Sequence, residues 1–406
     1  MRSFDVRKTA IVSILLFVLF AYGLFLSQHR FGILRDELEP ANAPGFYDYR
    51  GTTHVHTNLN LGSGSAKDVI AAAQEAGLDW LYVTDLNVFD RNLGVEGYHR
   101  QLLAMVGAEY SYLDSRVLSY DVLNRRSPPT LGQAQVQLAD QLSQAGDDAA
   151  DDLLVLAHPF KPGFSWSGAY PAGLDGIEVI NLKSVWQRSW LESRVSFFWS
   201  LFVYPFNSSL ALARLYEEPD EELRLWDQLN VGRRAFGFAG AEATAKMPWL
   251  GTGSLRFPSY ETSFSLASNH VLLRSELTGE AEGDKRKVTR ALADGQFYFS
   301  LDVLGNPKGF SAYVQDRDKI YPMGARLKWR EGMKIVSRLP RKPTVPFETA
   351  FLKDGQLVMS SNSLETEYVV QGPGSYRLVV RVFVQLTLPD GQRWMSWIYA
   401  NPFHVD

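Results

Sequence analysis

Short apolar runs, each followed at once by a polar residue suited to metal binding or acid–base chemistry, recur between residues 47 and 305. Two examples are "WLYVTD", which ends at Asp85, and "LLVLAH", which ends at His158. Helical stretches separate these runs, as in "SAKDVIAAAQEAG", where Ser65 is a cap and Gly77 a stop signal. The alternation is typical of a mostly parallel sheet wrapped by helices.

The polar residues at the predicted strand ends form one set. If parallel strands close into a ring, their carboxyl ends meet at one rim, so these side chains are predicted to converge. The set consists of His54, His56, Asp85, Glu109, His158, Asn181 and Glu242.

The pair His54 and His56 lies in "YRGTTHVHTNLNLG", where an extended segment runs into a loop. Side chains alternate with period two in an extended chain, so both imidazoles are predicted to lie on one side. That arrangement suits one zinc or manganese ion completed by carboxylates. The alternative is a pair of surface histidines that form hydrogen bonds. The chain has no cysteine, so thiolate ligands, disulfides and a cysteine nucleophile are excluded.

The N-terminal segment from Thr9 to Ser27 contains no charged residue. At about 1.5 Å per residue it nearly crosses a hydrocarbon core roughly 30 Å thick. A signal peptide has a shorter apolar core and a small-residue cleavage site, which "LFLSQHR" lacks, so we predict an uncleaved transmembrane anchor over residues 1–28. Arg2, Arg7 and Lys8 precede the span, so the N-terminus is predicted to be cytoplasmic. The bulk of the chain is then periplasmic or otherwise extracytoplasmic, on the inner (plasma) membrane.

Three further regions are predicted after the anchor. Residues 29–46 read as a juxtamembrane linker, residues 47–305 as the α/β unit, and residues 306–406 as a small β-sandwich of antiparallel strands. The turn signals "KDG", "GPG" and "PDG" support the last assignment. A hydrophobic content of 46% with 13% aromatic residues supports a sizeable core.

The charge balance argues against one class of partner. The formal net charge is -4, from 41 basic and 45 acidic residues. Such a chain has no basic field for sequence-independent nucleic-acid binding, so no nucleic-acid partner is expected.

The segment "GTTHVHTNLNLGSGSAKDVIAAAQEAGLDWLYVTDLN" resembles the opening of a PHP (polymerase and histidinol phosphatase) domain. "GAEYS", "VLAHP", "GLDGIEVIN" and "GRRAFGFAGAEATA" continue the resemblance in the expected order, over about residues 49–305. The resemblance implies a distorted (β/α)7 TIM-like barrel, a cluster of metal ions and hydrolysis of phosphate esters. A phosphorylated small molecule or an envelope component is the implied partner.

The sequence departs from the family pattern at several ligand positions. Leu61, Leu86 and Thr244 stand where the family has ligands, and Glu242 stands where it has an aspartate. The resemblance therefore implies one divalent ion, zinc or manganese, on His54, His56, Glu109 and Glu242 rather than a three-metal cluster.

The remaining candidates are assigned to catalysis and substrate binding. His158 is predicted as an acid or base, because its unperturbed pKa is near neutrality, and Asp85 as a residue that orients a histidine or water. Lys161 and Asn181 are predicted to contact substrate. For each residue a structural role stays open: Asp85 as a turn cap, Lys161 as a solvated loop lysine, Asn181 as a backbone hydrogen-bonding group and Glu242 as the start of a helix.

The leading prediction is a membrane-anchored phosphoesterase with a reduced metal site. The missing ligands favour an alternative, a catalytically inactive binding or scaffold protein of the cell envelope. A metal-dependent amidohydrolase is a third class, but the lysine and further histidines that it requires are not recognised. Finally, Val185–Phe206 is rich in tryptophan and phenylalanine; a core or domain-interface helix is favoured over one lying on a membrane.

Overall fold

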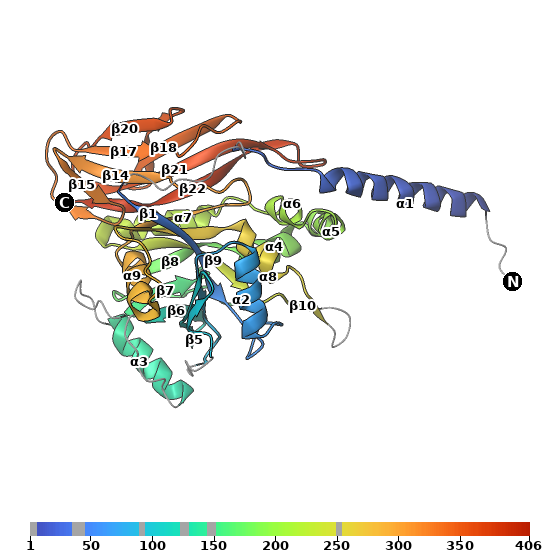
Figure 1. Ribbon diagram of the computed structural model, residues 1–406, viewed down its shortest axis with the longest axis horizontal. Helices are drawn as coiled ribbons and strands as arrows, with labels where there is room; N and C mark the ends of the chain where they lie inside the picture. Colours follow the sequence, from blue (N-terminus) through green and yellow to red (C-terminus); the bar gives the residue numbers. More distant parts are fainter. Residues whose placement is uncertain (1–5, 35–44, 89–93, 122–129, 144–151, 249–253) are drawn as a thin grey trace.

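The computed structural model describes residues 6–34, 45–88, 94–121, 130–143, 152–248 and 254–406. Residues 1–5, which include Arg2, and residues 35–44 of the predicted linker lie outside this part. Helix α1 (Val6–Ser27) projects from one side of the molecule (Figure 1). It is the one described helix with the length and composition to cross a membrane, a test that an N-terminal signal sequence also passes.

Eight strands curve around the region that holds the histidines. The ladder runs β4–β2–β1–β9–β8–β7–β6–β5, with parallel pairs from β4 to β7 and antiparallel pairs at β6. The strands are β1 (Tyr47–Val55), β2 (Trp80–Val83), β4 (Leu102–Val106), β5 (Ala108–Tyr112), β6 (Ser115–Asp121), β7 (Asp152–Ala157), β8 (Gly176–Asn181) and β9 (Phe236–Ala243). The short β3 (Gly97–His99) pairs with β4.

The predicted mixed α/β class is confirmed, but the ladder is not closed into a regular barrel. Among the described residues no ladder joins β4 to β6. The two ends of the ladder, β4 and β5, are instead consecutive lengths of chain on either side of Gly107. Gly107 still donates to the Val83 carbonyl at 2.8 Å, and beyond it the chain turns to pair with β6. The bend therefore replaces the pairing that a regular (β/α)7 barrel requires.

Helices pack around the strands. They are α2 (Ala66–Glu75), α3 (Leu131–Ser143), α4 (Leu182–Glu192), α5 (Arg194–Val203), α6 (Ser208–Ala213), α7 (Asp220–Gly232), α8 (Tyr260–Leu266) and α9 (Ala281–Ala293). Among them, α5 and α6 pack against neighbouring helices. Helix α2 begins and ends as predicted: Ser65 and Asp68 form a reciprocal capping box, and Gly77 follows the helix with φ +69°. The aromatic segment Val185–Phe206 forms two helices, α4 and α5, that meet at Ser193.

The C-terminal strands form a layer drawn in orange and red beside the green and yellow strands (Figure 1). The strands are β14 (Ser311–Asp316), β15 (Lys319–Pro322), β16 (Arg326–Leu327), β17 (Lys334–Arg338), β18 (Phe347–Lys353), β19 (Gln356–Ser361), β20 (Glu365–Val369), β21 (Gly374–Gln385) and β22 (Gln392–Val405). One antiparallel sheet has the order β15–β14–β17–β20. The hairpins at "KDG" and "PDG" turn at Gly355 and Gly391, both with positive φ, as turn residues do.

One sheet continues across the predicted boundary at residue 305. Strand β22 pairs with β13 (Phe297–Ser300), which pairs with β12 (Ser268–Leu273), which pairs with β1. The division into units at residues 305 and 306 therefore stays a prediction. Two short strands, β10 (Met247–Pro248) and β11 (Ser254–Leu255), form a separate pair.

A buried histidine lies in β12, one of the strands of this continuous sheet. His270 of β12 is fully buried, with Nδ1 2.9 Å from Asp48 Oδ1 and Nε2 3.3 Å from Asp302 Oδ1. Tyr298 donates to Asp48 at 2.6 Å, and Arg50 pairs with Asp302. Burial by itself lowers the pKa of His270, but the two carboxylates outweigh burial and raise that pKa to about 9.

The raised pKa predicts a pH-dependent stability. A histidine whose pKa is higher in the folded chain contributes stability fully below pH 6.5 and loses it as the pH rises through about 9. We expect the difference in unfolding free energy between the wild type and His270→Gln to shrink by up to about 3 kcal/mol across that window. Urea unfolding followed by tryptophan fluorescence at both ends of the window measures this. An unchanged difference would show that His270 is not charged in the fold.

Candidate metal centre

Five of the predicted residues do meet at one end of the sheet: four lie at the carboxyl ends of β1, β7 and β9, and Glu109 lies near the start of β5. His54 lies in β1 and His56 just beyond it, Glu109 in β5, His158 just after β7 and Glu242 in β9. Each is buried, with at most 3% of its surface exposed. For these five residues, a position at the end of a predicted apolar strand therefore indicated correctly that the side chains lie together.

Glu109 is the centre of the group. Its Oε1 lies 3.5 Å from Nε2 of His54 and 3.8 Å from Nε2 of His158, and its Oε2 lies 3.6 Å from Nε2 of His56. Ligand atoms around one tetrahedral zinc ion are about 3.3 Å apart, from metal–ligand bonds of roughly 2.0 Å. The spacing is close to that required by a shared ion, and a small inward movement would suffice.

Glu242 stands on the other side of His158. Its Oε2 lies 3.9 Å from Nε2 of His158, while Oε1 pairs with Lys161 and lies 3.3 Å from Nζ of Lys183. Burial by itself raises the pKa of Glu242, but Lys161 and His158 outweigh burial and hold that pKa well below its usual value. Glu242 is thus a carboxylate with one oxygen engaged by lysine and one aimed at the histidines.

Several atoms that face one another in this group have no hydrogen-bond partner. They are Nε2 of His54, Nε2 of His56, Oε2 of Glu109 and Oε2 of Glu242. Buried polar atoms without a partner are costly, and a metal ion satisfies such atoms at once. The chemistry of the atoms, imidazole nitrogen and carboxylate oxygen, fits zinc or manganese.

The ligand atoms define two overlapping groups: His54, His56 and Glu109, and His54, His158 and Glu242. His54 is common to both. Its Nδ1 is already bound to Oε1 of Glu178 at 2.7 Å, so only Nε2 remains for an ion. An ion held by either group would therefore bind the same Nε2 atom of His54.

Three members of the site have a backbone conformation that side chains rarely adopt. His54, His158 and Glu242 have φ values of 61°, 33° and 39°. Such left-handed positions cost free energy for residues other than glycine, and they concentrate at functional sites. At His54 the strand also has a bulge, since its register with β2 shifts between Thr52 and Val55 and its register with β9 shifts between Thr53 and Val55. The two imidazoles do lie on one side, with ring centres 5.2 Å apart, but the strand has a bulge at His54 where regular alternation was expected.

The pKa values of the two imidazoles are shifted in opposite directions. Burial favours the neutral form of both rings. For His54, Glu178 and Glu109 outweigh burial and raise the pKa to about 10. For His56, burial dominates and lowers the pKa to about 3. The pKa of Glu109 is lowered, because His158 and His54 outweigh its burial.

Glu178 was not among the predicted residues, yet its carboxylate contacts His54 directly. It is fully buried, and besides His54 it accepts from the His158 backbone at 3.2 Å and from Nδ2 of Asn181 at 2.8 Å. A carboxylate that holds the second nitrogen of a ligand histidine fixes its tautomer and orientation. The signal in the sequence was a glutamate inside the apolar strand "GIEVIN".

Asn181 and Asp85 take structural positions around the centre. Asn181 is the N-cap of α4, where its Oδ1 accepts from the Ser184 backbone at 2.9 Å. Asp85 accepts from the backbone and the hydroxyl of Thr57, both at 2.7 Å, and its Oδ1 is 4.0 Å from Nδ1 of His56. Asp85 thus holds the loop after β1, and Asn181 acts on His54 through Glu178.

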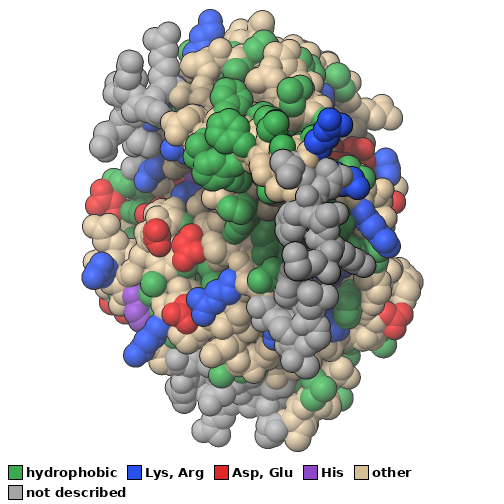
Figure 2. Space-filling model, turned by 90° about the vertical axis from the view of Figure 1, so that its right-hand side faces the viewer, with side chains coloured by type: hydrophobic (Ala, Val, Ile, Leu, Met, Phe, Trp, Pro, Cys, Tyr) green, Lys and Arg blue, Asp and Glu red, His purple; other side chains and the backbone are tan. Residues whose placement is uncertain are grey.

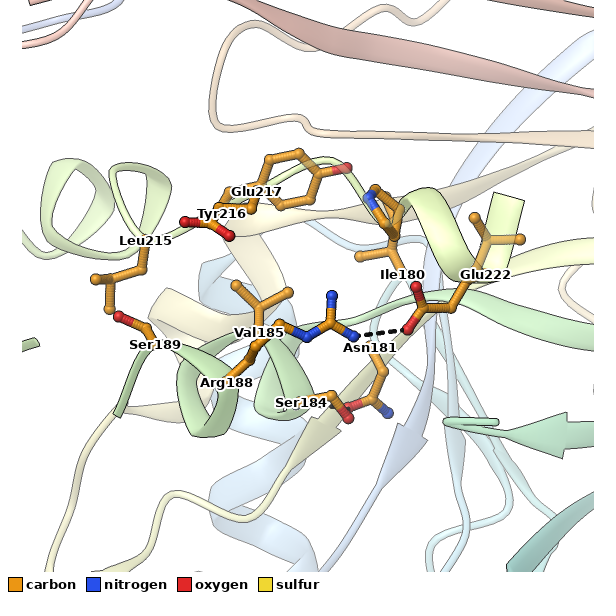
Figure 3. Close-up of a pocket in the computed structure, with 12 residues that line it drawn as sticks. Ile180, Asn181, Ser184, Val185, Arg188, Ser189, Leu215, Tyr216, Glu217 and Glu222 are labelled. Atoms are coloured by element: carbon orange, nitrogen blue, oxygen red, sulfur yellow. Dashed lines mark hydrogen bonds and ion pairs between the residues drawn. The ribbon is translucent and has the colours of Figure 1, made fainter. Parts of the chain in front are cut away.

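A small cavity beside Asn181 is too small for a substrate. Figure 3 shows Ser184 next to Asn181 at the start of α4, and the ion pair between Arg188 and Glu222 at 3.1 Å. The cavity volume is about 20 Å³, room for roughly one water molecule.

Three cationic side chains lie beside Glu109 and Glu242. Lys161 is buried, so the solvated-loop alternative does not hold, and Lys183 is one-quarter exposed. Arg116 of β6 lies 3.8 Å from Glu109 and over the Phe164 ring at 4.6 Å. Lys183 and Arg116 were not predicted; a cation beside a strand end carries no distinctive pattern.

The fold and the site together define an α/β chain with a buried histidine and glutamate group suited to a divalent ion. No protein-family model matches the sequence, and no curated protein matches it. Two solved structures are similar to it. One is a two-domain protein from Bacteroides vulgatus containing a predicted PHP-like metal-dependent phosphoesterase, with 12% identity over 89% of this chain and 99% of that chain, at a TM-score of 0.37.

The other is a putative metal-dependent phosphoesterase from Bifidobacterium adolescentis, with 13% identity over 55% of this chain and 95% of that chain, at a TM-score of 0.28. At these TM-scores neither supplies a residue role, and the centre described above stands on this chain's own side chains.

Proposed function

We propose that this chain is a PHP-like, metal-dependent phosphoesterase that is anchored in a membrane by α1. The observation that carries the proposal is the set of buried nitrogen and oxygen atoms of His54, His56, Glu109 and Glu242 that face one another without partners. The proposal places one divalent ion among them. Such an ion acts as a Lewis acid and lowers the pKa of a water molecule toward neutrality.

The chain's own residues divide the remaining work. Glu178 orients His54 through Nδ1, so that Nε2 points into the centre. His158 has its Nε2 beside Glu109 and Glu242, and we assign it as a further ligand in place of the free acid or base expected from the sequence. A histidine that ligates through Nε2 cannot also donate a proton from that atom.

The cations supply charge for a phosphate ester. Lys183 and Arg116 are partly exposed and lie beside the acidic members of the site, and Lys161 supports them from a buried position. In our proposal they neutralise the phosphate as negative charge develops on it, a task that a second ion performs in two-metal sites. The proposed substrate is a phosphorylated small molecule or an envelope component. Residues 29–406 lie outside the cytoplasm in this proposal.

A second function is favoured by one observation. The ligand side chains are at most 4% exposed, so a phosphate reaches them only if the surrounding loops open. A site that stays closed would hold the ion as a structural element and make the chain a non-catalytic envelope protein.

Metal removal tests the proposal. The full chain, purified in detergent and loaded with zinc or manganese, is expected to hold about one ion. It is expected to hydrolyse phosphomonoesters or phosphodiesters, to lose turnover with a chelator, and to regain it when the ion is restored. Elemental analysis and a phosphate-release assay measure both quantities. His99→Ala, which removes a histidine bound to the Val95 carbonyl outside the centre, is the matched control and should behave as the wild type.

The outcomes separate the two functions. Bound metal without turnover on either ester class would support the non-catalytic role. A chain that refuses every divalent ion would contradict both, because both place an ion in the centre.

A further inference from the structure

A group of large apolar side chains is exposed around α5. Its members, here called the α5 patch, are Trp190, Leu191, Val195, Phe198 and Leu388, with exposed fractions of 40%, 60%, 84%, 56% and 73%. Helix α5 itself carries apolar residues on both faces, since Phe197 and Val203 are buried while Val195 and Phe198 face outward. A contiguous apolar surface of this kind marks an interaction site.

The α5 patch adjoins the end of α1. Tyr22 of α1 lies with its ring 6.0 Å from that of Trp199 in α5, and its hydroxyl donates to the Leu388 carbonyl at 3.0 Å. Tyr22, Val195, Trp199 and Leu388 line one open recess of about 530 Å³. Figure 2 faces the side from which α1 projects, and hydrophobic side chains gather in the upper part of that view.

Specific contacts hold α1 against the α5–α6 pair. Asn207 donates from Nδ2 to the carbonyls of Leu26 and His29, both at 3.0 Å, and so satisfies the end of α1. Gly23 lies against the Phe206 ring so closely that any side chain at position 23 would overlap it. The direction of α1 relative to α5 is therefore set by packing.

The length of α1 then gives the depth at which the α5 patch would lie in a membrane. The span Arg7–Ser27 has 21 residues, or about 31 Å of helix, against a hydrocarbon core of roughly 30 Å. Phe20, whose ring is 6.0 Å from that of Phe206, lies roughly 10 Å before the end of this span. Side chains that contact Phe20 and Tyr22 are thus at the level of the lipid headgroups and the outer acyl chains.

We propose that the α5 patch is inserted into the interfacial region of the phospholipid bilayer that α1 spans, so that the globular part lies on the membrane in one orientation. This inference rests on the membrane anchoring in the proposed function. Phospholipid is the occupant because the patch is continuous with the lipid-facing surface of α1, where Phe17 is 70% exposed, and because tryptophan is favoured at this depth.

The absence of cysteine makes the test direct. Single cysteines are introduced by Val195→Cys, by Leu113→Cys as a matched control and by Phe17→Cys as a reporter of the anchor. Leu113 is 75% exposed in the β5–β6 turn and belongs to no part of the patch. Each full chain is labelled with a fluorophore, reconstituted into phosphatidylcholine vesicles, and quenched with either spin-labelled lipid or aqueous iodide.

We expect the label at position 195 to be quenched several-fold more by lipid than the label at position 113, and to be protected from iodide. Lipid quenching at position 17 but not at 195 would overturn the inference and leave the anchor intact. Lipid quenching at none of the three positions would overturn the anchor together with the inference. Circular dichroism of each labelled chain confirms that it is folded.

Discussion

Replacing Glu109 with glutamine is expected to lower metal affinity at least about 100-fold and to reduce phosphoester hydrolysis to background. Loss of an outer hydrogen-bonding partner of a ligand costs up to about that factor, and Glu109 is placed as a ligand itself. Its two oxygens lie 3.5 to 3.8 Å from the Nε2 atoms of His54, His56 and His158. Glutamine keeps the shape but replaces one oxygen with an NH2 group, which donates and cannot ligate.

A second acid-to-amide change serves as the control. Glu222 is also buried, at 7% exposed, but it accepts from Arg188 away from the centre. Glu222→Gln should keep both metal and turnover. Isothermal titration with zinc or manganese and the phosphate-release assay compare the variants. A Glu109→Gln chain that binds the ion as tightly as the wild type would remove Glu109 from the ligand set.

Gly240→Ala is expected to destabilise the chain by about 3 kcal/mol and to weaken metal binding at least about tenfold. A Cβ atom at position 240 of β9 would overlap the carboxyl group of Glu178. Glu178 must then move, and Nδ1 of His54 loses its buried charged partner. Because Gly240 has no side chain, it leaves the space that the Glu178 carboxylate occupies.

A double-mutant cycle tests that explanation. When Glu178→Ala has already emptied the space, adding Gly240→Ala should cost less than about 1 kcal/mol. Gly132→Ala in α3, where a Cβ meets no atom within 4 Å, should be neutral or slightly stabilising. Urea unfolding measures the four chains of the cycle and the Gly132→Ala control. Fully additive losses would mean that Gly240 and Glu178 do not share this space.

The sequence was sufficient to place most of the centre because polarity at a strand end is a local property. His54, Glu109, His158 and Glu242 each follow or end an apolar run, and the fold brings those runs side by side. The same reason explains why three other features were predictable: the helix over residues 66–75, the antiparallel C-terminal strands and the apolar N-terminal helix. Caps, turns and continuous apolar runs each depend on residues that are close together in the sequence.

Features that depend on contacts between distant segments could not be predicted. The bulge that gives His54 a positive φ arises from unequal register with β2 and β9. The partnership of Glu178 with His54 depends on the bare backbone of Gly240 in a neighbouring strand. The docking of α5 against α1 likewise joins segments that are far apart in the chain. A charged residue inside an apolar strand, as at Glu178, is the one local sign that was available.

The pairing of β13 with β22 sets an order of events during synthesis. Strand β13 is complete at residue 300, but β22, which covers its edge, emerges only after residues 301–391. For that interval a nascent chain exposes an unpaired strand edge two strands away from β1, which carries His54, and open edges recruit other chains. A pause in translation between β13 and β22 would prolong the exposure of this edge. We therefore expect selection for rapid export, or for chaperone binding, while the residues between these two strands are synthesised.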